Sequence, residues 1–336
     1  MDAFDDSRLE DADALRDADA LIRPLAEAGA RLRRAVDRLE VPLSGLRADD
    51  LPRAVIAFGP EARLLRAVLE PSCPVPFVAW PRLGLPGWAG ALDTVVALGA
   101  TNPVSLAAAK EATRRGARLV VACPPDSELA RVSASRSTTL LPLPDTDGLT
   151  TGIVTLEALH RLGLGPQVDV PAVAQAMDDV AIESAPGLDI AHNPAKGVAL
   201  ELADASPLVW GGSVLAARAS RRVAEALRGA SGRMVLSADA EALEPFLRGA
   251  PRRDVFADPF EELAPQRRPG LVVIDDAWGD ELATVEQDRL ITAALAHDLL
   301  VSRLTAEVGG RVQRYVTVLH KGLYAAAYLE IGLARR

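Results

Sequence analysis

Glycine, hydroxyl and amide residues follow the apolar run 94–98, in a short loop that contains Gly99, Thr101 and Asn102. Hydroxyl groups and backbone N–H groups at the start of a helix are donors that hold phosphate in many α/β proteins. Asn102 and Pro103 are typical of the cap and the first turn of a helix. Pro103 also removes one backbone donor, so this loop offers a phosphate fewer hydrogen bonds than a loop without proline.

A second glycine loop, formed by Gly211, Gly212 and Ser213, follows the apolar run 208–210. Glycine lets the backbone approach a ligand closely, and Ser213 precedes a helical stretch that carries Arg218 in its first turns. Short Gly-Gly-Ser runs also form ordinary turns. The sequence therefore fits both a phosphate or sugar contact and a plain turn at this loop.

His192, Asn193 and Lys196 form a third polar cluster, just before the second half of the chain. Lys196 can neutralise a phosphate, or it can be a solvated cation on a helix. Asn193 fits a ligand contact, and it equally fits the cap of a helix that begins at Pro194. These ordinary roles remain open. Because the cluster lies between the two halves of the chain, we expect His192 and Lys196 among the ligand-binding residues.

The composition indicates a folded protein of two ordinary domains. The chain has 336 residues, of which 49% are hydrophobic and 25% are charged. The formal net charge of −9 argues against nucleic acid as a partner. The start is acidic, and no apolar run resembles a signal core or is long enough to span a bilayer. We expect a cytoplasmic protein that does not contact a membrane.

Two cysteines, Cys73 and Cys123, are too few for a disulfide framework, and neither has the spacing of a metal ligand. Each stands at or near the end of an apolar run, so we expect both to be buried as small hydrophobic residues. The sequence predicts no metal and no cofactor.

The elements that position the candidate loops follow from hydrophobic patterning. Apolar residues recur at helical spacing from 14 to 39, and Pro24 and Gly29 interrupt them, which predicts two helices or one kinked helix. Further along, apolar runs predict strands and the stretches between them predict helices. Strands are expected at 54–58, 76–80, 94–98, 119–122 and, at an edge, 138–143, with helices at 61–69, 103–115 and from 127.

Three amphipathic helices follow, and then the alternating pattern begins again. The three helices are expected at 150–162, 171–182 and 193–203. In the second pass, strands are expected at 208–210, 233–236, 270–275 and 299–302, with helices at 216–227, 240–247, 284–297 and 311–333.

Both halves share one order of elements, which predicts an α/β fold of two tandem doubly wound parallel-sheet domains. An N-terminal helical arm and a long C-terminal helix complete the fold. The expected segments are 1–50 for the arm, 51–148 for the first domain, 149–205 for a helical connector and 206–336 for the second domain with its closing helix. A cleft between two such domains is a natural ligand site.

This layout, together with the run from His192 to Lys196 and the run 325–329 in the closing helix, resembles the double sugar-isomerase (SIS) domain proteins. Within them, the pattern is most similar to the bifunctional phosphoglucose/phosphomannose isomerases of bacteria and archaea. The resemblance extends over nearly the whole chain from about residue 54. It implies two SIS-like domains, a phosphorylated hexose as ligand and a homodimer.

The sequence departs from that family at its functional motifs. The loop after the first strand keeps Gly59 but lacks the family's serine, and Glu61 adds a negative charge beside the expected phosphate. The family's catalytic glutamate corresponds to the stretch 227–232, which contains no carboxylate. Its histidine corresponds to the stretch 239–247, which contains no histidine.

An aldose–ketose isomerase needs a base that moves a proton between C1 and C2, and a group that opens the sugar ring. The replacements that the sequence offers are Glu61, Glu225, Glu241, Glu244, His192 and His320. Of these we predict Glu225 and His320 as catalytic residues, His320 because the segment 320–322 interrupts the closing helix. A solvated helix face for Glu225 and a helix-terminating or surface role for His320 are the ordinary alternatives.

The sequence therefore favours a protein that binds a sugar phosphate and resembles the phosphoglucose/phosphomannose isomerases, with aldose–ketose isomerisation weak or lost. One alternative is an active but divergent isomerase of glucose 6-phosphate and mannose 6-phosphate. A subunit that regulates a partner enzyme and a purely structural dimer partner are the others.

Overall fold

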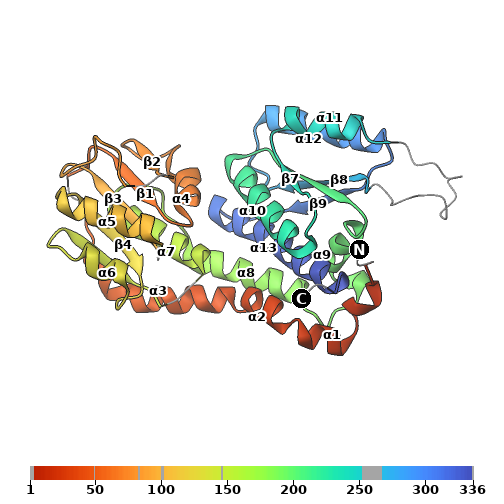
Figure 1. Cartoon of the computed structure of the whole chain (residues 1–336), viewed down its shortest axis with the longest axis horizontal. Coiled ribbons are helices and arrows are strands. Elements are labelled where there is room, and N and C mark those ends of the chain that lie inside the picture. Colours follow the sequence, from red (N-terminus) through yellow and green to blue (C-terminus); the bar gives the residue numbers. More distant parts are fainter. Residues whose placement is uncertain are drawn as a thin grey trace, which may run out of the picture. The chain divides into compact units, whose positions relative to one another are not determined.

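The computed structural model describes residues 4–48, 50–81, 84–99, 102–144, 147–251 and 267–334. The chain forms two compact units (Figure 1): unit 1 comprises Met1–Glu27 and Gln175–Arg336, and unit 2 comprises Ala28–Ala174. The predicted arm, 1–50, and the predicted connector, 149–205, are thus each shared between the two units. Each unit has a parallel sheet with helices on both faces, which confirms the predicted α/β fold of two doubly wound sheets.

Unit 2 is built on a five-stranded parallel sheet with the strand order β2-β1-β3-β4-β5. All five strands that the sequence predicts here are present, and β5 lies at an edge as expected. The strands are β1 (Val55–Phe58), β2 (Phe77–Ala79), β3 (Thr94–Leu98), β4 (Arg118–Cys123) and β5 (Thr138–Pro142). The helices are α3 (Ala28–Ser44), α4 (Ala62–Leu69), α5 (Pro103–Arg114), α6 (Glu128–Ser133) and α7 (Gly148–Arg161).

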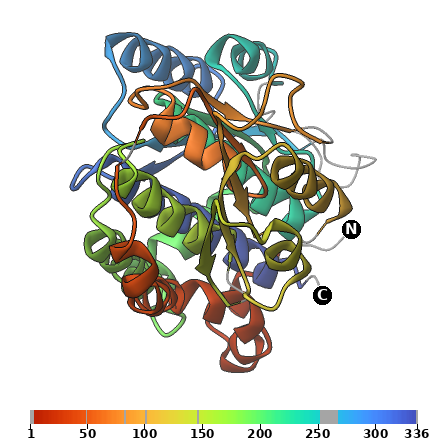
Figure 2. The same cartoon turned by 90° about the vertical axis from the view of Figure 1, so that its left-hand side faces the viewer.

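The central strands of unit 2 are apolar on both faces because helices cover the sheet on both sides. Helices α5 and α6 pack on one face, around a core that includes Val95, Leu119 and Val121, and α4 and α7 pack on the other (Figure 2). Cys123 belongs to the first of these cores, as predicted, whereas Cys73 is only partly buried. Burial raises the pKa of both thiols, which makes them poor nucleophiles at neutral pH.

Unit 1 is built on a four-stranded parallel sheet with the order β7-β6-β8-β9. The strands are β6 (Ser206–Gly211), β7 (Leu236–Ser237), β8 (Pro269–Asp275) and β9 (Val301–Thr305). The helices that follow them are α10 (Val214–Ser231), α11 (Ala240–Arg248), α12 (Glu281–Leu295) and α13 (Arg311–Gly332). Before the sheet come η1 (Asp6–Leu9), α1 (Ala12–Asp17), α2 (Asp19–Ala26), α8 (Val170–Glu183, which spans the division between the units), η2 (Ile190–His192) and α9 (Pro194–Glu201).

Helices α11 and α12 pack on one face of the sheet of unit 1, and α10 and α13 pack on the other (Figure 1). The long helix α13 approaches α10 closely at Gly322, where a Cβ atom would lie 2.9 Å from Cγ1 of Val223. In the described part of the chain, no helix is both long and apolar enough to cross a membrane.

The first described residues are bound to the far end of α13. The backbone N–H of Asp5 donates to the carbonyl oxygen of Gly332 (2.9 Å), and Nε of Arg8 donates to that of Ile331 (2.8 Å). The ring of Phe4 lies against Gly332, where a Cβ atom would be 2.7 Å from Cδ2 of the ring. The two ends of the sequence thus close one structural unit.

Three predicted elements differ from the structure. The N-terminal segment forms the three helices α1, α2 and α3 instead of two helices or one kinked helix. The strand expected at 233–236 is reduced to β7, two residues at the sheet edge. The closing helix is not interrupted at 320–322, because Gly322 continues α13 and allows the contact with Val223.

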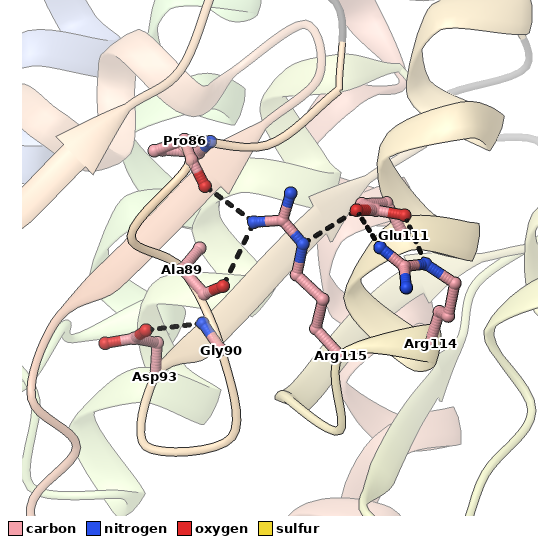
Figure 3. A network of polar contacts seen from close by, with 7 residues as sticks. All are labelled: Pro86, Ala89, Gly90, Asp93, Glu111, Arg114 and Arg115. Carbon is pink, nitrogen blue, oxygen red and sulfur yellow. Dashed lines mark hydrogen bonds and ion pairs between the residues drawn. The ribbon is translucent and has the colours of Figure 1, made fainter.

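Charged side chains connect the loop between β2 and β3 to the end of α5 (Figure 3). Nη1 of Arg115 donates to the carbonyl oxygens of Pro86 (2.8 Å) and Ala89 (3.1 Å), while its Nε donates to Oε1 of Glu111 (2.7 Å). Glu111 accepts two further bonds, from Nε and Nη2 of Arg114. This network lies at the amino ends of the strands, so it serves the fold of unit 2 and is distant from the ligand end of the sheet.

Replacing Glu111 with glutamine is expected to destabilise the protein at neutral pH and to lose this effect in acid. Hydrogen bonds from Arg114 and Arg115 lower the pKa of Glu111 from 4.5 to about 2. A carboxylate whose pKa is lower in the folded state contributes stability that is complete above the unfolded value, 4.5, and is lost as the pH falls through about 2. Urea unfolding of wild type and E111Q at about pH 7 and about pH 3 should show a smaller difference in acid. If wild type and E111Q differed equally in free energy of unfolding at the two pH values, this account would be contradicted.

Candidate functional site

The winding of the sheet in unit 1 reverses between β6 and β8. The chain passes from β6 to the edge strand β7 and then returns to β8 on the other side of β6. In open α/β sheets, ligands bind beside the carboxyl ends of the strands at such a reversal. The candidate site therefore consists of the loop after β6 and the loop after β8.

Gly211 and Gly212 are both required by packing within unit 1. A Cβ atom on Gly211 would lie 2.9 Å from Cβ of Ala216, and one on Gly212 would lie 2.7 Å from Cβ of Ala283. The loop therefore approaches the first turns of α10 and α12 so closely that only glycine fits. This packing explains both glycines without a ligand.

Ser213 caps α10 and is bound to a buried carboxylate. Its Oγ accepts the backbone N–H of Ala216 (3.0 Å) and donates to Oδ2 of Asp276 (2.6 Å). Asp276 follows β8 and is only 2% exposed, and its Oδ1 accepts the backbone N–H of Trp278 (3.3 Å). The position beside the start of α10, which could attract an anion, already has a carboxylate of this chain.

The loop after β8 brings an aromatic ring and two arginines together. Trp278 is 46% exposed, and the guanidinium carbons of Arg311 and Arg314 lie 5.5 Å and 5.2 Å from the centre of its ring. Ala277 has a φ of +49°, a left-handed conformation that bends the chain between Asp276 and Trp278. Cation–π contacts of this length favour one position of the ring.

The sheet of unit 2 reverses its winding between β1 and β3, where Gly59 and Gly99 lie. Gly59 has a φ of +113°, and a Cβ atom there would overlap the carbonyl oxygen of Leu98. The N–H of Gly99 donates to the carbonyl oxygen of Ala122 (2.7 Å). At this reversal the two strand ends are therefore in direct contact with each other.

Asn102 has the predicted capping role, since its Oδ1 accepts the backbone N–H of Ser105 (2.9 Å) at the start of α5. Thr101 lies outside the described residues. Glu61, at the position before α4, is 2% exposed, and its Oε1 would be 3.5 Å from a Cβ atom on Gly148. Each unit thus has a buried carboxylate near a loop in which phosphate binding is predicted.

The two predicted catalytic residues are in different environments within unit 1. Glu225 is exposed on α10, whereas His320 is buried in α13. Helix α13 is continuous through His320, so this residue does not end a helix. Arg218, the cation predicted to bind phosphate, is also buried, on the first turns of α10.

The run from His192 to Lys196 is folded around the loop before α9. Asn193 caps α9 by accepting the N–H groups of Ala195 and Lys196 (both 3.1 Å). His192 is exposed, and its ring nitrogen Nδ1 lies 2.7 Å from Oδ1 of Asp189. That hydrogen bond lowers the pKa of Asp189.

Lys196 is the most deeply buried cation of this run, with a side chain that is 0% exposed. Its Nζ donates to the carbonyl oxygens of Pro186 (2.9 Å) and Leu188 (2.6 Å), and it lies 5.4 Å from the ring centre of Tyr328. Burial lowers the pKa of Lys196 and raises that of Tyr328 to about 12. The alternative of a solvated lysine is thus wrong, because the ammonium group is buried and holds the backbone of the loop before α9, while phosphate binding by Lys196 stays a prediction.

Sequence reasoning missed Asp276, Trp278, Arg311 and Arg314. A signal for the first two was present, because they come directly after the predicted strand 270–275, at its carboxyl end. Over the ranges that the structure describes, no group of three His, Cys, Asp or Glu side chains is arranged to hold a metal ion.

Comparison with known proteins identifies the fold through solved structures alone. No family model matches the sequence, and no curated protein matches it. A glucose-6-phosphate isomerase like protein from Thermus thermophilus is 19% identical, with a TM-score of 0.51, and the match covers 92% of both chains. A putative phosphosugar isomerase from Bacillus subtilis is 15% identical with a TM-score of 0.58, and the match covers 92% of this chain and 95% of that one.

A third solved structure, a putative tagatose-6-phosphate ketose/aldose isomerase from Clostridium novyi, is 12% identical with a TM-score of 0.61. The match covers 96% of this chain and 91% of that one. At these identities the similarity establishes the fold and not the activity. The chain therefore has the two-domain α/β fold of solved phosphosugar isomerase-like proteins, as the resemblance to SIS domain proteins implied.

Proposed function

We propose that this protein binds a phosphorylated hexose at the carboxyl end of the sheet in unit 1, and that aldose–ketose isomerisation is weak or lost. The observation that supports it best is the group of donors and the aromatic ring at the reversal between β6 and β8. There the ring of Trp278, a residue that is 46% exposed, lies beside two guanidinium groups. Sugars stack on such faces, and guanidinium groups bind phosphate.

The environments of the two carboxylates Glu225 and Asp276 support weak or absent catalysis. A base must reach a proton on C1 or C2 of the substrate. Glu225 is exposed on α10, and both carboxylate oxygens of Asp276 already accept hydrogen bonds, from Ser213 and from Trp278. Neither oxygen of Asp276 is thus open to a substrate unless one of these hydrogen bonds breaks.

An active but divergent isomerase is the second candidate, and Asp276 is the observation that favours it. This carboxylate is buried at the ligand end of the sheet. If substrate displaces the Ser213 hydroxyl, Oδ2 becomes available to accept a proton. Turnover would decide between the two candidates.

Millimolar glucose 6-phosphate or fructose 6-phosphate is expected to raise the melting temperature of the purified protein by several degrees. A ligand that binds only the folded state stabilises it by about 2.7 kcal/mol when its concentration is 100 times its dissociation constant. Thermal-shift measurements with each hexose phosphate, and with unphosphorylated glucose as the control, test the proposal. No shift with any hexose 6-phosphate would contradict it, and so would an equal shift with glucose.

In a coupled assay, the conversion of fructose 6-phosphate to glucose 6-phosphate or mannose 6-phosphate should remain below about one turnover per second, the low end of ordinary enzymes. Faster turnover would establish the divergent isomerase instead. We also propose a homodimer, a cytoplasmic location and kinship with the bifunctional phosphoglucose/phosphomannose isomerases. The homodimer and the kinship rest on the sequence resemblance, and the location rests on the sequence pattern, in which no apolar run resembles a signal core or is long enough to span a bilayer.

A further inference from the structure

Arg311 has an uncommitted guanidinium group at the candidate site. Among the described residues, its buried Nε has no hydrogen-bond partner, and no carboxylate forms an ion pair with it. Its one defined contact there is with the face of the Trp278 ring. A guanidinium group has five N–H donors, so Arg311 retains the capacity to bind an anion with two parallel hydrogen bonds.

Arg314 contacts the same ring and holds the loop through its Nε and Nη1 groups. Its Nε donates to the carbonyl oxygen of Gly309 (2.8 Å), and its Nη1 donates to those of Asp276 (3.2 Å) and Ala277 (3.1 Å). The two arginines therefore have different roles. Arg314 fixes the position of Trp278, and Arg311 remains available to a ligand.

The glycine loop that the sequence favours is a poorer place for phosphate. The Ser213 hydroxyl accepts one bond and donates its only hydrogen to Asp276, whose carboxylate is buried. A phosphate at this loop would lose that donor and would lie beside a negative charge in a region of low dielectric constant. Anion binding is therefore favoured at Arg311.

We propose that Arg311 binds the phosphate group of the ligand while the exposed part of the Trp278 ring packs against its sugar ring. This inference rests on the proposed function and assigns that function's anion contact to the start of α13 instead of the loop Gly211–Ser213. A phosphate here would pair with the guanidinium group without displacing any hydrogen bond between described residues. The ligand class is a sugar whose phosphate and ring lie close together, as in a hexose 6-phosphate.

The test is a fluorescence titration of wild type, R311Q, R311K and R303Q with glucose 6-phosphate, inorganic phosphate and glucose. Arg303 is an exposed arginine on β9 and serves as the matched control. We expect R311Q to weaken the binding of glucose 6-phosphate about 10- to 100-fold, the usual range for a charge-assisted pair. R311K should lose less affinity than R311Q, because it keeps the positive charge although it lacks the two parallel donors. R303Q should bind glucose 6-phosphate like wild type. In the W278F variant, the change in tryptophan fluorescence on addition of glucose 6-phosphate should disappear.

The outcomes separate the inference from the proposed function. If wild type binds glucose 6-phosphate and R311Q binds it equally well, the inference fails while the proposed function stands. If wild type shows neither a fluorescence change nor a thermal shift, the proposed function itself fails. If R311Q does not fold, as circular dichroism would show, the comparison of R311K with R303Q decides. Equal affinities of those two variants would overturn the inference.

Discussion

Replacing Gly59 with alanine is expected to lower the free energy of unfolding by about 3–5 kcal/mol. Two costs add. The φ of +113° is a backbone conformation that residues other than glycine rarely adopt, and a Cβ atom there would overlap the carbonyl oxygen of Leu98. That oxygen is part of the backbone at the end of β3, so the clash cannot be relieved by rotating a side chain. Urea unfolding of the purified variant would measure the loss.

Gly99 is the matched control for this substitution. It also follows a strand of unit 2 and has a positive φ, +48°, but a Cβ atom there would have no described atom within 4 Å. G99A should therefore lose only the conformational part, about 1–2 kcal/mol. If G59A and G99A were equally destabilised, close contact between the ends of β1 and β3 would not be the reason for Gly59.

Replacing Lys196 with alanine is expected to cost about 3 kcal/mol of folding free energy, the second large effect. The variant leaves the carbonyl oxygens of Pro186 and Leu188 without their donor and opens a cavity beside the ring of Tyr328. Thermal or urea unfolding would measure the loss. Since Lys196 contacts the backbone of its own unit, K196A should leave the affinity for glucose 6-phosphate unchanged in protein that remains folded.

Two further variants separate the contributions of Lys196. K196M restores most of the volume but not the hydrogen bonds, so it should recover only part of the stability that K196A loses. The exposed Lys110 on α5 is the control, and K110A should change stability by less than about 0.5 kcal/mol. A K196A protein as stable as wild type would mean that the two carbonyl groups find water or another donor.

Most of the fold could be predicted because buried parallel strands are continuous apolar runs, and their boundaries with loops are marked by glycine and proline. The weakest prediction was at β7, where the apolar side chain of Met234 is 90% exposed and only two residues pair with β6. At a sheet edge, composition does not determine whether a side chain is buried. Likewise Gly322 suggested a helix break, whereas its packing against Val223 is a tertiary contact that a single segment cannot reveal.

The candidate site could be predicted only in part, since its chemistry depends on which strands are neighbours. The loop Gly211–Ser213 was recognisable from its residues, but its buried partner Asp276 lies 63 positions further along the chain. Arg311 becomes a candidate phosphate-binding residue only through its position over Trp278, which follows a different strand. The burial of Lys196 could not be predicted for the same reason, because the burial of a lysine is determined by segments that pack over it.

The joining of the first residues to the end of α13 has a consequence for the order of events during synthesis. Unit 2 is one continuous stretch, so it can fold as soon as Ala174 has left the ribosome. Unit 1 needs both ends of the chain, since Phe4, Asp5 and Arg8 find their partners only when Ile331 and Gly332 have been made. The segment that includes Phe4, Asp5 and Arg8 therefore reaches its folded position last, and a chain truncated just before Ile331 would yield a folded unit 2 and an unfinished unit 1.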